Sequence, residues 1–180
     1  MNLHLRPRSA LALLFILVSL GSVGYVVAVA MNYASFYPAL STLNLQVERI
    51  GVERDPGSGN LLLRVNIAIS NPGGYSGFRV YAFDLKVFFV HRHLSNNSLF
   101  QDQPLLASQT LGKPLGPRST IDSDTSIVLL SQQSASFSQF NETYPGEVAA
   151  RTTLRVQFNT FLDPVIGRVV IERAGDFALS

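Results

Sequence analysis

The side chains best placed for chemistry are two histidines, His91 and His93, which lie two residues apart. On an extended strand such residues share a face, and their imidazoles could bind a metal ion if a third ligand joined them. No third ligand is near them in the sequence. We therefore predict two solvated loop histidines that follow a strand, and no metal site.

Asp122 and Asp124 are also spaced to share a face. They lack the glycine and the distal glutamate of a calcium-binding loop, so we predict a solvated turn. The chain has no cysteine, which excludes disulfides, thiolate metal sites and a cysteine nucleophile. It also lacks a Gly-x-Ser-x-Gly elbow, a phosphate loop and a dinucleotide fingerprint. We expect no catalytic residue, no cofactor and no small-molecule substrate.

Two asparagines begin N-x-Ser/Thr sequons, Asn96 in Asn-Asn-Ser and Asn141 in Asn-Glu-Thr. Both lie in segments that we predict to be loops. They are candidate glycosylation sites if the domain faces outward.

The N-terminal part of the chain predicts one membrane helix. The segment Ala10 to Ala30 is 21 residues long without a charge, about 31 Å as a helix, which matches a hydrocarbon core of about 30 Å. Arg6 and Arg8 precede it, and the next basic residue is Arg49. The positive-inside rule then places residues 1–9 in the cytoplasm and the rest of the chain outside it. Membrane lipid is thus one predicted partner.

A second interpretation of this segment remains open. Ala28-Val29-Ala30 has the A-x-A pattern of a signal-peptidase site, so the helix could be removed. The apolar run is longer than the usual 7 to 15 residues of a cleaved signal, which favours a retained anchor.

Residues 31–41 lose the helical pattern and contain Pro38, so we predict a short stalk. Four aromatic residues are expected to lie near the outer headgroups, where amphipathic rings are favoured: Tyr25, Tyr33, Phe36 and Tyr37.

Residues 42–180 form one predicted extracytoplasmic domain. Lys and Arg exceed Asp and Glu by two, which Arg6 and Arg8 account for, leaving twelve charges of each sign beyond residue 30. A neutral domain argues against nucleic acid as a partner.

Alternating apolar residues predict antiparallel strands joined by turns. Asn71 and Pro72 are expected to turn the chain between two long strands. The predicted strands are 43–52 with a bulge at Glu48 and Arg49, 61–70, 82–90, 105–110, 125–130, 148–158 and 165–172. A short helix over 131–140, capped by Ser131, should place Phe137 and Phe140 on one face. This pattern predicts an all-β antiparallel sandwich of the immunoglobulin or fibronectin type III kind.

The strand Leu63 to Ser70 that ends in Asn71-Pro72, followed by a strand from Phe78 to Phe89, resembles the late-embryogenesis-abundant group 2 family, also called the WHy (water stress and hypersensitive response) domain. The later order is similar: a proline-rich segment, a strand, a short helix and a final strand pair. The resemblance covers about 130 residues, and Gly73 departs from the polar residue usual in plant members. It implies a fibronectin-like sandwich without enzymatic activity, tied to stress or defence responses and often anchored by one N-terminal helix.

The segment around Pro114, Leu115 and Pro117 predicts an edge or crossover, because proline cannot donate to a central ladder. It is a candidate contact for strand addition, or its prolines protect the edge from aggregation. Expected partners are other membrane or envelope proteins.

Three functions fit these features. The chain can be a WHy-like anchored module that binds or shields other proteins, an archaeal pilin-like or archaellum-stator-like subunit, or an accessory subunit of a membrane complex. A pilin-like subunit would be cut near Ser9 or Ala10 and would polymerise through its helix.

Overall fold

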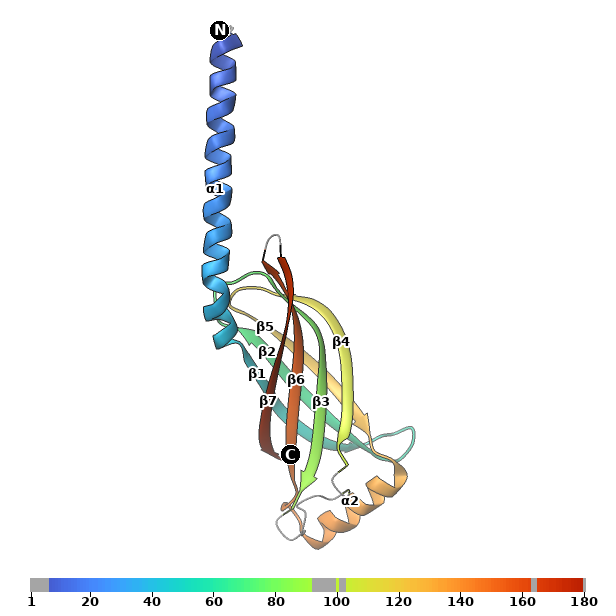
Figure 1. Ribbon diagram of the computed structural model, residues 1–180. Coiled ribbons are helices and arrows are strands. Elements are labelled where there is room, and N and C mark those ends of the chain that lie inside the picture. Colours follow the sequence, from blue (N-terminus) through green and yellow to red (C-terminus); the bar gives the residue numbers. More distant parts are fainter. Residues whose placement is uncertain (1–6, 92–99, 101–102, 163–164, 180) are drawn as a thin grey trace.

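The computed structural model describes residues 7–91, 100, 103–162 and 165–179 (Figure 1). Two helices and seven strands follow one another as α1 (Pro7–Thr42), β1 (Asn44–Arg54), β2 (Leu61–Asn71), β3 (Phe78–Val90), β4 (Leu105–Leu115), β5 (Ser119–Val128), α2 (Ser131–Thr143), β6 (Ala149–Leu162) and β7 (Val165–Ala178).

The strands form two antiparallel sheets with the orders β1-β2-β5 and β4-β3-β6-β7. Each central strand alternates buried and exposed residues, so one face of each sheet is apolar. These faces bury a common core that includes Leu63, Ile67, Phe83, Leu85 and Val156. The prediction of an all-β domain with one short helix behind an N-terminal helix is confirmed.

The first hairpin forms as predicted. In the β1–β2 register Val47 pairs with Ile67 and Arg49 with Asn66, which leaves Glu48 as the extra residue of a bulge. The connecting turn closes through the Asp55 N–H, which donates to the Asn60 carbonyl at 2.7 Å.

Helix α1 is longer than predicted. Residues 31–41, expected to be a non-helical stalk, continue the helix to Thr42 through Pro38. The cause is tertiary: Phe36 and Ala39 are buried against the sandwich, and this burial offsets the backbone hydrogen bond that proline cannot make. The segment Ser9–Thr42 is long and apolar enough to cross a membrane.

Strand β5 begins earlier than predicted. It pairs with β2 along its whole length, from Asn71 opposite Ser119 to Leu62 opposite Val128. Asp122 and Asp124 therefore lie on a strand, and the prediction of a solvated turn is wrong. Polar residues occupy both faces of this strand, since the half-buried Ser123 and Thr125 alternate with the exposed Asp122 and Asp124, so the sequence shows little apolar alternation there.

Helix α2 covers the end of the sandwich opposite α1 (Figure 1). The predicted cap is wrong, because the helix is capped by Leu130, whose N–H donates to Gln133 Oε1 at 2.9 Å. Phe137 is buried, its ring centroid 4.9 Å from that of Phe89, and Phe140 also packs against the core, so the predicted apolar face is confirmed.

Candidate functional site

The side chain of Asn71 ties together three segments where α1 meets the sandwich. It is fully buried at the end of β2. Its Nδ2 donates to the carbonyls of Tyr75 at 2.9 Å and of Gly116 at 3.1 Å, and its Oδ1 accepts the Gly73 N–H at 3.0 Å. Donor and acceptor capacity are both used, so the amide fixes the turn after β2 and joins it to the β4–β5 connection.

The turn lies directly against helix α1. A Cβ added to Gly73 would lie 2.7 Å from the Cβ of Ala39 and 2.8 Å from its Cα. Real Cβ atoms do not approach so closely, so glycine is needed here for space. Pro72 has a fixed φ and no N–H, which suits a residue that leaves the ladder. The predicted turn at Asn71 and Pro72 is thus also a seat for the helix.

An aromatic cluster next to this turn also contacts α1. The ring of Phe36, on α1, lies edge-on to that of Tyr75 with centroids 5.2 Å apart, and Tyr75 lies 4.6 Å from Phe78. The Tyr75 hydroxyl donates to the Phe161 carbonyl at 2.8 Å. Burial raises the pKa of Tyr75 above its ordinary value. The prediction that Phe36 lies among headgroups is wrong, since the sandwich buries it.

The proline-rich segment lies beside the turn. Pro114 and Pro117 are exposed on an edge strand and its following turn, as the edge prediction requires. Leu115 is fully buried opposite Phe78, so its side chain is not available to a partner. The Arg118 N–H donates to the Gly73 carbonyl at 3.3 Å. Part of this segment therefore belongs to the helix seat.

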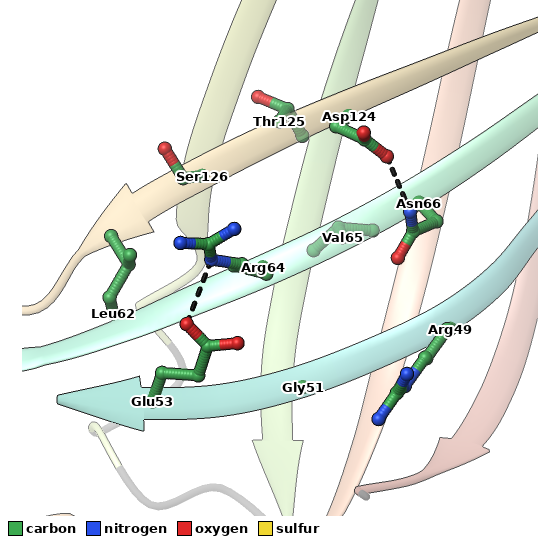
Figure 2. Close-up of a pocket in the computed structure, with 10 residues that line it drawn as sticks. All are labelled: Arg49, Gly51, Glu53, Leu62, Arg64, Val65, Asn66, Asp124, Thr125 and Ser126. Atoms are coloured by element: carbon green, nitrogen blue, oxygen red, sulfur yellow. Dashed lines mark hydrogen bonds and ion pairs between the residues drawn. The ribbon is translucent and has the colours of Figure 1, made fainter.

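A hollow of about 460 Å³ lies on the outer face of the three-stranded sheet (Figure 2). Arg64 Nε lies 2.9 Å from Glu53 Oε2, and Asn66 donates to Asp124. Both side chains of the ion pair are more than half exposed. These groups satisfy one another across the strands, and we interpret the face as a solvated polar surface.

The prediction that His91 lies in solvent is wrong. It is 2% exposed, with Nε2 3.4 Å from Glu147 Oε2 and its ring centroid 4.5 Å from that of Phe140. It closes the end of the sandwich under α2. Among the described residues no three His, Asp or Glu side chains are placed to hold a metal ion. His93 lies outside the described residues.

Of the two sequons, Asn96 lies outside the described residues. Asn141 is exposed but lies in α2 rather than in a loop, because the helix extends to Thr143. The prediction of a loop at this sequon is wrong, while glycosylation stays a prediction.

Sequence reasoning missed the docking face of α1. Asn32, Phe36 and Ala39 recur at intervals of three or four residues on α1, and all are at least partly buried. This is the spacing of one helix face, and it was the signal in the sequence that could have identified the docking face. Because proline is unfavourable inside a helix, Pro38 instead favoured the prediction of a stalk.

No protein-family model and no curated protein matches the sequence. Several solved structures are similar in backbone. A solution structure from Arabidopsis thaliana has 11% identity and a TM-score of 0.42, covering 76% of this chain and 82% of the other. A Bordetella pertussis protein described as ApaA has 14% identity and a TM-score of 0.39, covering 76% and 94%. A protein from Archaeoglobus fulgidus has 9% identity and a TM-score of 0.38, covering 74% and 97%. Scores this low carry no argument about fold or function.

Proposed function

We propose that this chain is a non-enzymatic, membrane-anchored module of the WHy type, with one N-terminal helix in the bilayer and a sandwich on the extracytoplasmic side. Its work is to bind or shield other envelope proteins near the membrane surface. The pairing of β4 with β3 supports a fibronectin type III-like sandwich, since the constant-type immunoglobulin fold places its fourth strand in the first sheet.

One observation carries the proposal: α1 runs without a break from an exposed apolar stretch into the seat around Asn71. An anchor that ended in a flexible stalk would let the domain swing. A helix packed on Gly73 and Tyr75 instead holds the domain at a fixed height and angle above the bilayer. A module held this way meets its partners over a restricted part of its surface.

One further observation supports a binding role. The exposed edge of β4 offers backbone groups for strand addition at Pro114 and its neighbours. This feature needs no cofactor.

Membrane fractions of the native source test the anchor and its orientation. We expect the chain to resist alkaline extraction, to retain residues 1–8, and to lose its domain to protease added outside intact cells. Release by alkaline washing, or a domain that only lysis exposes to protease, would contradict the proposal.

The same long helix favours one alternative, a pilin-like subunit. The N-terminal half of α1 is exposed and its C-terminal turns are docked, which is an arrangement that can polymerise through the free half. N-terminal sequencing separates the two functions: cleavage near Ser9 or Ala10, together with filaments on the cell surface, would support the pilin-like subunit.

A further inference from the structure

The charges of the domain are unevenly distributed along its length. We define the membrane end as the described residues of 70–80, 111–121, 158–161 and 166–169, where the strands begin or end beside α1. These segments hold four basic residues, Arg79, Lys113, Arg118 and Arg168, and no acidic residue. All four are exposed. Asp163 lies between two of the segments in the sequence, outside the described residues.

Because four basic residues gather at the membrane end, a domain that is neutral as a whole carries an excess of positive charge at this end. Beyond residue 30 the chain has twelve basic and twelve acidic residues. Among the described residues outside the membrane end, seven basic side chains stand against ten acidic ones. The distal part is therefore net acidic. An even distribution would give the membrane end neither its excess of positive charge nor its lack of carboxylates.

The charges of these four basic side chains are not paired with any described carboxylate. No ion pair involves any of them among the described residues. The Arg79 guanidinium lies 5.9 Å from the centroid of the Phe161 ring, and that of Arg168 lies 6.0 Å from the Tyr81 ring. These contacts hold the guanidinium groups over aromatic faces and leave their charge available to an anion.

Apolar side chains are exposed beside these charges. Phe161 and Ile166, at the end of the β6–β7 pair, are 40% and 70% exposed. This end lies beside the C-terminal turns of α1 (Figure 1), and α1 contacts β6. Exposed apolar residues next to unpaired basic residues are typical of surfaces that contact a bilayer interface.

The helix places this surface at headgroup height. From Ala30, where the apolar run ends, to Phe36, the first buried residue of the seat, six residues of helix rise about 9 Å. The headgroup layer is about 5–8 Å thick on each side of the hydrocarbon core. Basic side chains at the membrane end are then within one Debye length, about 8–10 Å, of lipid phosphates.

We propose that the membrane end binds the anionic headgroups of the leaflet in which α1 ends, so that the domain lies on the bilayer and does not stand free of it. This inference rests on the proposed anchoring by α1. The recognised chemistry is the lipid phosphate, with Arg79, Lys113, Arg118 and Arg168 as its ligands and Phe161 and Ile166 entering the interface.

The test uses the full chain in nanodiscs of phosphatidylcholine, with or without phosphatidylglycerol. Because the chain has no cysteine, a single fluorophore can be placed at Ile166→Cys, and at Ser136→Cys on α2 as the distal reference. Quenching by headgroup spin-labelled lipid reports contact. One variant carries Arg79→Gln, Lys113→Gln, Arg118→Gln and Arg168→Gln. Its matched control carries Arg54→Gln, Lys86→Gln, Arg155→Gln and Arg173→Gln.

We expect several-fold stronger quenching at position 166 when phosphatidylglycerol is present, a loss of that gain at raised ionic strength, and no change at position 136. Each basic residue removed from the membrane end should lower the ratio of docked to undocked domain about five-fold. The control variant should behave as the wild type does.

Equal quenching in both lipid mixtures, or equal loss in the control variant, would overturn the inference. If a variant fails to fold, the dependence of quenching on ionic strength and on phosphatidylglycerol in the chain without these four substitutions still tests the inference. Crosslinking of the membrane end to an acidic protein, with no lipid dependence, would also overturn it. A chain that alkaline washing strips from liposomes, yet that binds anionic vesicles through these four residues, would refute the anchor and keep the inference.

Discussion

The two ends of the sandwich are closed in different ways. At the membrane end, directional hydrogen bonds from Asn71 and Tyr75 fix a turn against which α1 packs. At the distal end, α2 covers the core with Phe137, and His91 fills the space beside Glu147. Apolar contacts tolerate small displacements, whereas three bonds from one amide do not. The membrane end is therefore built to hold a helix in one position, and the distal end to exclude water.

Asn71→Ala should have the largest effect on this comparison. The change leaves the Tyr75 and Gly116 carbonyls and the Gly73 N–H without a partner in a buried site, so we expect the free energy of unfolding to fall by about 3 kcal/mol. Urea unfolding of the full chain in micelles measures it. Asn44→Ala, at an exposed position of β1, is the matched control and should change stability by less than about 0.5 kcal/mol. Equal effects at the two positions would remove the special role of the turn.

Gly73→Ala should come next. The added methyl would overlap Ala39, so either the helix or the turn must move, at a cost of about 2 kcal/mol. Hydrogen exchange should show loosened amides in residues 36–42 but not in α2. Gly74, where an added Cβ meets nothing within 4 Å, provides the control Gly74→Ala. Unchanged exchange in α1 would show that the close approach is not required.

Ser134→Ala removes a buried hydrogen bond at the distal end. Ser134 Oγ accepts the Leu61 N–H at 3.0 Å, so its loss should lower stability by about 1 kcal/mol. Exchange should rise in α2 and stay unchanged in residues 36–42. A loosened α1 in this variant would mean that the two ends are coupled and that the comparison fails.

Tyr75→Phe should produce the smallest change, visible mainly in alkali. Burial raises the pKa of Tyr75 in the folded chain above the value near 10 that it has when unfolded. The neutral phenol is thus favoured by the fold, and its contribution is complete below pH 10 and lost as the pH rises through the folded pKa. Stability of the wild type should fall more steeply above about pH 10 than that of Tyr75→Phe. Parallel curves would contradict a buried phenol.

The sequence allowed most strands to be predicted, because alternating residues such as Leu63, Val65 and Ile67 report a sheet with one buried face. It also located the turn at Asn71 and the bulge at Glu48. It did not reveal the burial of His91, since Glu147 lies 56 residues away and only the folded sheet brings the two together. Pro38 hid the helix seat, because the local cost of proline is evident in a sequence and the compensating burial of Phe36 is not.

The central claim is that α1 and the sandwich move as one body. The chain has no cysteine, so Met31→Cys on α1 and Thr110→Cys on β4 introduce the only two thiols to which spin labels can be attached. Both positions are exposed. Their distance distribution, measured by pulsed electron paramagnetic resonance on the full chain in nanodiscs, should be single and narrow, and should broaden in Asn71→Ala. A broad distribution in the otherwise unchanged chain would show a domain that swings on its anchor and would contradict the account.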